Sequence, residues 1–156
     1  MRKLIAIGLT VFIFLTLNGF IGPYKYEFTE REDELLMLIS DAEAGNQGVK
    51  GQALIMRVVL NRWLSGDYGP DIESVIFADG QFYTPGMPRE PSDKARIALN
   101  MVKHGWDESQ GALYFCATGY NGDVPLFKYR GHYFSRKEPI DERCERTSGW
   151  VYEEVS

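Results

Sequence analysis

The stretch 29–44 reads TEREDELLMLISDAEA, and its pattern predicts the first helix of a folded domain. Thr29 and Glu32 have the spacing of a capping box, in which each side chain bonds the backbone N–H of the other residue. Acidic residues fill the first turn, where the helix dipole favours negative charge. Gly45 follows the last apolar position and marks the helix end. Because both ends and the apolar face of this helix are clear, the other elements are predicted relative to it.

Glu43 stands at the end of the apolar face of this helix. Helical steps back from it lead to Ile39, Leu36 and Leu35, so its carboxyl group shares their side of the helix. Burial and the negative end of the helix dipole both raise the pKa of such a carboxyl. An acid that stays protonated near neutral pH is what glycosidic cleavage requires as its general acid. The alternative is a side chain that extends into solvent at a frayed helix end.

The segments that follow predict helices first and strands later. The second helix is apolar nearly all round and is expected to be the central buried one. The later segments are short and rich in aromatic residues, which favours strands. The expected fold class is therefore α+β, with a helical lobe and a small β-rich lobe. The expected helices cover about 50–64, 71–77 and 92–105, and the expected strands cover 112–115 and 132–135.

The N-terminus has the pattern of a membrane signal. Arg2 and Lys3 precede a run over residues 4–22 that contains no charged residue. As a helix, at about 1.5 Å per residue, this run just spans a hydrocarbon core of roughly 30 Å. A good cleavage site is absent, so we expect a signal-anchor in the cytoplasmic membrane with the rest of the chain outside. The alternatives are a cleaved signal peptide, which gives a secreted protein, and a buried core helix.

Length and charge limit the remaining choices. The 156 residues suit one domain, so the expected plan is an anchor or signal peptide over 1–24, a catalytic domain over 25–136 and a polar tail over 137–156. The net charge of −5 disfavours nucleic acid as a partner. The two histidines, His104 and His132, lie far apart in the sequence, so we expect no metal site and no cofactor.

The sequence contains two cysteines, Cys116 and Cys144. If the domain is exported, they can pair and close a loop of about 29 residues, which stabilises the fold by roughly 3–4 kcal/mol. Two independent buried thiols are the alternative, because the sequence does not report the distance between them.

Six short motifs occur in a fixed order along the chain. They are Ala42-Glu43-Ala44, Gly51-Gln52, Val58-Val59-Leu60-Asn61-Arg62, Gly80-Gln81-Phe82, Ala112-Leu113-Tyr114-Phe115 and Gly131-His132-Tyr133-Phe134. Their order and spacing resemble the SleB-type cell-wall hydrolases, a family of spore-cortex lytic enzymes also found in other bacteria and in bacteriophages. The resemblance covers about 35–136, and it depends on the order of the motifs, since none of them is specific alone.

The resemblance implies a lysozyme-like, two-lobed enzyme that degrades peptidoglycan as a lytic transglycosylase. The glutamate of the family's A-E-A motif corresponds to Glu43. It would protonate the bond between N-acetylmuramic acid and N-acetylglucosamine, and then act as base on a hydroxyl of the muramic acid. One carboxyl group suffices for this reaction, and the product is an anhydro-sugar. A hydrolase that uses water would need a second carboxylate such as Asp123.

Four further residues are candidates for substrate binding. Gln81 can bond an acetamido or hydroxyl group, and Phe82 can pack on a sugar face. Tyr114 and Tyr133 can line the β side of a cleft. Each has a structural alternative, because Gln81 can cap a turn and aromatic side chains at such positions often belong to the core. Asn61 and Arg62 are expected to hold structure through buried hydrogen bonds or an ion pair.

Three positions depart from the family pattern. The family often has Arg-Gly-Glu-Pro where this chain has Gly45-Asn46-Gln47-Gly48, and Gln47 cannot ionise. Asp41 replaces a frequent tyrosine, and Cys116 replaces an asparagine. These changes leave Glu43 intact but affect the expected cleft. A membrane-anchored protein that binds glycan without cleaving it is the alternative to an enzyme.

Overall fold

The computed structural model of the protein describes residues 24–117 and 125–137. The apolar run 4–22, Asp123, Cys144 and the predicted polar tail beyond residue 137 lie outside them. The elements, in chain order, are α2 (Glu30–Ala44), α3 (Gly48–Ser65), α4 (Ile72–Phe77), the 3-10 helix η1 (Thr84–Gly86), α5 (Asp93–Lys103), β1 (Tyr114–Cys116), β2 (Phe127–Tyr129) and β3 (His132–Ser135).

Helix α2 begins and ends where its sequence predicts. The Thr29 hydroxyl accepts a hydrogen bond from the Glu32 N–H at 3.2 Å, and the Glu32 carboxylate accepts one from the Thr29 N–H at 2.9 Å. At the other end, the Gly45 N–H donates to the Asp41 carbonyl at 3.0 Å. The capping box is therefore confirmed, and Glu43 lies in the last turn of the helix.

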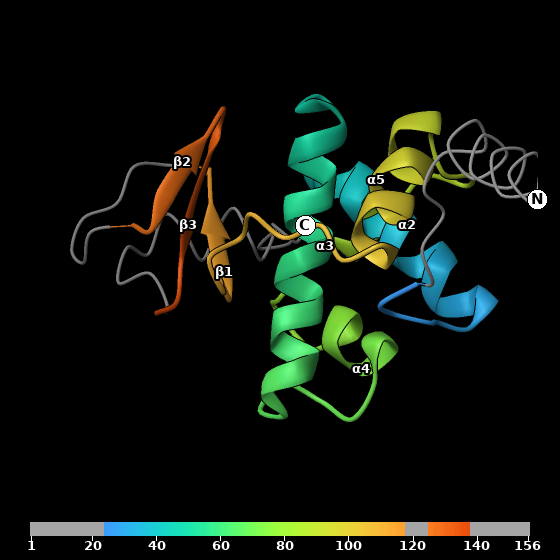
Figure 1. The fold of residues 1–156 in the computed structure, drawn as a ribbon, viewed down its shortest axis with the longest axis horizontal. Coiled ribbons are helices and arrows are strands. Elements are labelled where there is room, and N and C mark those ends of the chain that lie inside the picture. The colour runs from blue at the N-terminus through green and yellow to red at the C-terminus, as the bar shows by residue number, and fades with distance from the viewer. Residues whose placement is uncertain (1–23, 118–124, 138–156) are drawn as a thin grey trace, which may run out of the picture.

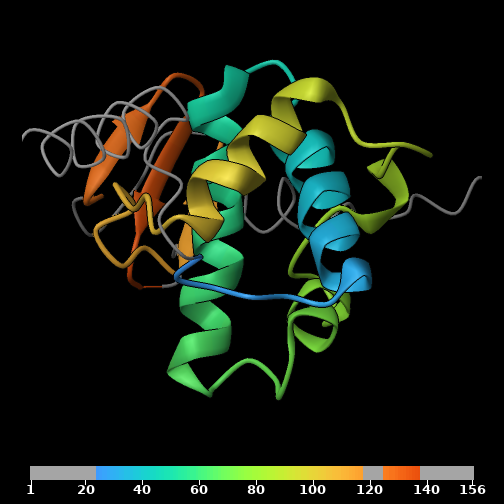
Figure 2. The ribbon, with the colours of Figure 1, turned by 45° about the vertical axis from the view of Figure 1, so that its right-hand side comes forward.

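Helix α3 is the centre of the helical lobe. An unbroken run of its side chains is buried, from Gly51 to Leu60. Helices α2 and α5 pack on α3 and on each other, and α4 packs against α2 and α3 (Figures 1 and 2). A run that is apolar nearly all round needs such cover on several sides, which explains its central place.

The three strands form a small antiparallel sheet of order β1-β3-β2, which stands beside α3 on the side away from α2 (Figure 1). Phe115, Phe134 and Phe127 lie opposite one another in the register and share one face. Phe134 is fully buried in the same core as the helices. Strand β2 was not predicted, because a run of three residues carries too little of the alternating pattern.

Polar side chains join the two lobes. The Asn61 amide of α3 donates to the Ala112 carbonyl at 2.9 Å, and the Arg62 guanidinium donates to the Leu113 carbonyl at 2.6 Å, just before β1 begins. The expected structural roles of Asn61 and Arg62 are confirmed. These bonds satisfy backbone groups at the start of the sheet and fix its position on α3.

The α+β class, with a helical lobe and a small sheet, is confirmed. Among residues 24–117 and 125–137, no helix is long and apolar enough to cross a membrane. The predicted hydrophobic helix over residues 4–22 is outside this range, and it stays a prediction.

Candidate active site

The Glu43 side chain is held against the loop that precedes η1. Its Oε1 accepts a hydrogen bond from the backbone N–H of Tyr83 at 2.6 Å. The side chain is half-buried, and its neighbour Ala44 is fully buried in the core. Glu43 therefore does not extend freely into solvent, so the alternative of a frayed helix end is excluded.

The pKa of the Glu43 carboxyl is raised to about 7. Burial is the largest cause, because it disfavours the charged form. The Tyr83 N–H and the nearby Arg62 guanidinium act in the opposite direction, and they lower the pKa by favouring the carboxylate. Burial exceeds both, so a large fraction of the Glu43 carboxyl groups carries a proton at neutral pH.

Arg62 is the cation that acts on the pKa of Glu43, and it is almost completely buried. Its Nη1 donates to Oε1 of Gln81 at 2.8 Å. Its guanidinium carbon lies 5.1 Å from the ring centre of Tyr68, 4.9 Å from that of Phe82 and 5.1 Å from that of Tyr114. Three aromatic rings around a guanidinium stabilise the cation and restrict its movement.

The predicted contact residue Gln81 is fixed by Arg62. A guanidinium has only donors, so the Gln81 oxygen must face it, and the amide nitrogen of Gln81 points elsewhere. Gln81 itself is half-buried. Its N–H groups are therefore donors with a fixed orientation, two residues before the backbone N–H that bonds Glu43.

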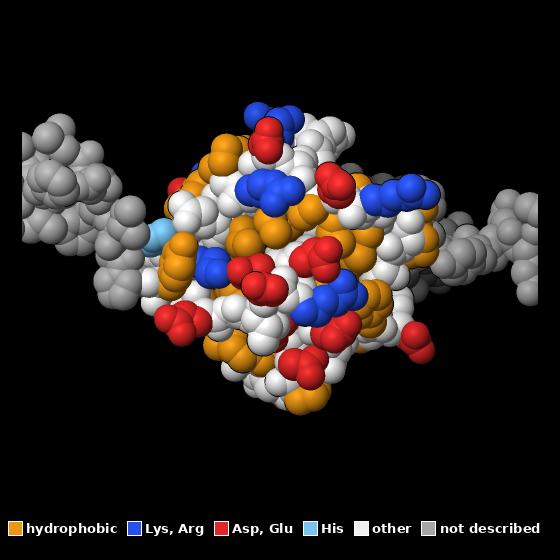
Figure 3. Space-filling model, turned by 90° about the vertical axis from the view of Figure 1, so that its right-hand side faces the viewer, with side chains coloured by type: hydrophobic (Ala, Val, Ile, Leu, Met, Phe, Trp, Pro, Cys, Tyr) orange, Lys and Arg blue, Asp and Glu red, His pale blue; other side chains and the backbone are white. Residues whose placement is uncertain are grey.

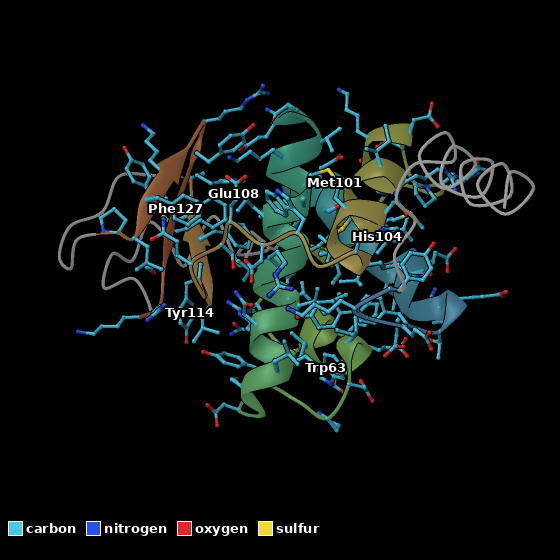
Figure 4. The ribbon with its side chains drawn as sticks, viewed as in Figure 1. Trp63, Met101, His104, Glu108, Tyr114 and Phe127 are labelled. Atoms are coloured by element: carbon cyan, nitrogen blue, oxygen red, sulfur yellow. The ribbon has the colours of Figure 1, made fainter. Side chains whose placement is uncertain are left out.

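Two of the predicted aromatic contacts, Phe82 and Tyr114, lie beside the Arg62 guanidinium. Phe82 is buried, and its ring packs on Phe115 with centroids 6.1 Å apart, which favours its core alternative. Tyr114 is half-buried at the end of the sheet beside α3 (Figure 4). Its hydroxyl bonds that of Tyr68 at 2.6 Å, and burial with this bond raises the pKa of Tyr68 to about 12.

The fourth predicted contact, Tyr133, is placed differently. Its neighbour in sequence, Phe134, faces the core, so Tyr133 points to the other face of the sheet. There the Lys128 Nζ donates to its hydroxyl at 3.0 Å. The register therefore turns Tyr133 away from the face that carries Phe134.

Asp41, two residues before Glu43, is fully engaged in structure. Its Oδ1 accepts from Nε2 of Gln52 and from the Ser92 hydroxyl, both at 2.6 Å, and its Oδ2 accepts from the Ser92 N–H at 2.7 Å. Ser92 is the N-cap of α5, so Asp41 ties α2 to α3 and α5. This arrangement agrees with the prediction that Asp41 is no partner for Glu43.

Gln47 and His132 meet between the lobes. The Gln47 Nε2 lies 3.0 Å from Nδ1 of His132, and both side chains are buried. Burial lowers the pKa of His132 to about 4, so its ring is neutral at physiological pH. In the part of the chain that the structure describes, no three side chains of histidine, cysteine, aspartate or glutamate gather to hold a metal ion.

The structure describes one of the two cysteines. Cys116 is buried at the end of β1. Its predicted partner, Cys144, lies outside the described residues, so the pairing of the two stays a prediction.

Sequence reasoning missed two contributors to the site. Tyr68 lies in the loop after α3, where no periodicity indicates its direction. Tyr83 acts through its backbone N–H, which side-chain patterns do not report. The arginine in Asn61-Arg62, at the end of an apolar helix, was the one local signal of a buried cation nearby.

Comparison with known proteins gives a consistent family match. A family model described as Cell Wall Hydrolase matches residues 46–136, starting just after Glu43. Spore cortex-lytic enzymes are similar over part of the chain. That of Oceanobacillus iheyensis is 32% identical over 96 residues, which are 56% of this chain and 33% of that protein. That of Bacillus subtilis is 33% identical over 96 residues, which are 56% of this chain and 30% of that protein.

The matched region therefore spans about a third of the length of these relatives. Among solved structures, the catalytic domain of the Bacillus cereus SleB protein is similar in fold, with a TM-score of 0.58 and 22% identity. The match covers 70% of this chain and 94% of that domain, and at this identity it supports the fold alone.

Proposed function

This chain belongs to the cell wall hydrolase family, and on that premise we propose that it degrades peptidoglycan. The bond cleaved is that between N-acetylmuramic acid and N-acetylglucosamine. The names of the similar spore cortex-lytic enzymes support a wall substrate.

Glu43 is the catalytic acid in this proposal. The observation that carries it is a half-buried carboxyl with a pKa of about 7 at the junction of α2, α3 and the loop before η1. The Tyr83 N–H occupies Oε1, which leaves Oε2 as the atom to hold the proton. A positioned acid with a pKa near the working pH is the most effective kind of general acid.

The reaction we propose is a lytic transglycosylation. Glu43 gives its proton to the glycosidic oxygen, and the bond from that oxygen to C1 of the muramic acid breaks. The Glu43 carboxylate then takes a proton from a hydroxyl of the same muramic acid, whose oxygen closes on C1. The acid is regenerated, and the product is an anhydro-sugar.

The surroundings of Glu43 support a mechanism with one carboxylate. Burial, the Tyr83 N–H and Arg62 account for the pKa of Glu43, with no contribution from another acid in the described residues. Asp41 is occupied by Gln52 and Ser92. We assign the Gln81 amide nitrogen to a hydroxyl or acetamido oxygen of the substrate, and Tyr114 to the β side of the cleft.

We further propose that residues 4–22 tether this domain to the outer face of the cytoplasmic membrane. The apolar run and the preceding Arg2 and Lys3 support this placement. Fractionation with intact-mass measurement tests it. A soluble species that begins near Tyr24 would instead indicate a cleaved signal.

Digestion of purified peptidoglycan, followed by mass spectrometry of the released muropeptides, tests the proposed activity. We expect products that end in anhydro-muramic acid, each lighter by one water than the hydrolysed product. Products with a free reducing end would indicate a muramidase that uses water. Binding without release would indicate a glycan-binding protein.

A further inference from the structure

The β2–β3 hairpin differs in charge from the rest of the molecule. Residues 125–137 contain Lys128, Arg130, Arg136 and Lys137 and no acidic residue, although the whole chain has a net charge of −5. On the side of the molecule away from the sheet, acidic and basic side chains alternate (Figure 3). The hairpin is therefore a local cationic surface on an acidic protein.

Tyrosine rings accompany the cations of this hairpin. The Lys128 Nζ lies 4.6 Å from the ring centre of Tyr133. The Arg130 guanidinium carbon lies 5.7 Å from the ring centre of Tyr129, and the Nζ of Lys50, from α3, lies 5.5 Å from the same ring. By the strand register, Tyr129 shares the face of Phe127 and Phe134, whereas Lys128 and Tyr133 lie on the opposite face. We call the three residues on the α3 side, Lys50, Tyr129 and Arg130, the cationic hairpin surface.

The cations of this surface differ in whether they already form an ion pair or a hydrogen bond. Lys50 forms an ion pair with Glu108. Arg130 is exposed, and it has neither a hydrogen bond nor an ion pair within the part of the chain that the structure describes. Its fork of N–H donors is thus available to a planar anion such as a carboxylate.

The backbone of Arg130 is unusual for its residue type. Its φ is 47°, in the left-handed region, within the tight turn Arg130-Gly131 that joins β2 to β3. Such hairpin turns favour asparagine or glycine, whose conformations fit at little cost. An arginine at this position is strained, and its charge is the property that asparagine would not supply.

The turn of the hairpin lies against the connection from α2 to α3, which follows Glu43 in the sequence. A Cβ added to Gly48 would lie 3.5 Å from Nη1 of Arg130, so the guanidinium rests on the start of α3. Gly48 follows Glu43 by only five residues in the sequence, which limits their separation to about 18 Å. The first turn of α3 contains no acidic residue, so nothing there neutralises Arg130.

We propose that the cationic hairpin surface binds the carboxylate groups of the stem peptides that peptidoglycan carries on its muramic acid. The inference rests on the proposed function and names the part of the substrate recognised outside the cleavage point. The sugars present hydroxyl and acetamido groups without charge, whereas the stem peptides present carboxylates. Cations on this surface therefore select glycan that carries peptides over bare glycan.

The test is binding by the full chain with Glu43→Gln, so that substrate is not consumed. Soluble glycan strands are compared with the same strands after an amidase has removed their peptides. Arg130→Asn should weaken binding to the peptide-bearing strands about three- to fivefold, as expected for an exposed charge contact, and leave binding to stripped strands unchanged. It should not lower the melting temperature, because asparagine suits the turn.

Lys94→Gln is the matched control, since it removes one exposed positive charge from α5, and it should change neither affinity. The inference is overturned if Arg130→Asn weakens binding equally to both kinds of strand or weakens binding to neither. It is also overturned if the Glu43→Gln chain that retains Arg130 binds neither kind of strand. Binding to vesicles of anionic phospholipid that depends on Arg130, with no preference between the strands, overturns it in favour of a membrane contact. Cleavage by the chain that retains Glu43 is measured separately. That measurement tests the proposed function and not the binding inference.

Discussion

Asp41 and Glu43 stand two residues apart on the last turns of the same helix, yet the structure surrounds them in opposite ways. The Asp41 carboxylate accepts three hydrogen bonds, from Gln52 and from both the hydroxyl and the N–H of Ser92. For the Glu43 carboxyl the structure gives one, from the Tyr83 N–H, and burial raises its pKa to about 7.

The difference separates a structural acid from a reactive one. Donors around a carboxylate fix it in place, as Gln52 and Ser92 do for Asp41. Burial with few donors makes the charge unfavourable and keeps the proton, as it does for Glu43. Substitutions at the two positions should therefore affect different properties.

The largest expected effect is the loss of activity in Glu43→Gln. The amide keeps the shape of the side chain but has no acidic proton, so glycan release should fall about a hundredfold to ten-thousandfold. Release of muropeptides measured beside circular dichroism of the same sample checks this. Residual activity above about a tenth of wild type would mean that another group supplies the proton.

Asp41→Ala should affect stability most. It leaves the amide of the buried Gln52 and the N-cap of α5 without their acceptor, so the free energy of unfolding should fall by about 3–5 kcal/mol. Denaturant unfolding measures the change. If the variant unfolds as easily as wild type, the three bonds of Asp41 do not hold the helices together.

The smallest effect is a pH-dependent difference in stability between Glu43→Gln and wild type. The folded pKa of Glu43, about 7, lies above its ordinary 4.5. Between these values the unfolded chain ionises first, so wild type loses stability as pH rises through this window and the glutamine variant does not. The difference should grow from pH 4 to pH 8 and reach at most about 3 kcal/mol.

Thermal unfolding of both proteins across this pH range provides the measurement. A constant difference between them would show that the Glu43 carboxyl titrates alike in the folded and unfolded chains. That result would contradict the contrast with Asp41, whatever the activity of either variant.

Local patterns predicted one side of this site well. The capping box at Thr29 and the apolar spacing before Glu43 depend on neighbours within a few residues, so α2 and its acid could be placed from the sequence. The same holds for α5, which starts after the N-cap Ser92 as predicted.

Contacts between distant segments could not be predicted in the same way. Arg62 meets Gln81 and the carbonyl of Leu113 only because the chain folds back twice. The burial of Phe82 also depends on Phe115, far along the sequence. Hydrophobicity indicates that such a ring avoids water, but not whether it does so in the core or against a sugar.

The role of Glu43 as the acid is tested most directly by how the rate of glycan cleavage varies with pH. Measured as kcat/KM on soluble glycan strands, at pH values where the fold stays intact, the rate should fall on the alkaline side with an apparent pKa near 7 as Glu43 loses its proton. A rate that stays constant or still rises between pH 7 and about pH 9 would contradict the role of Glu43 as the acid.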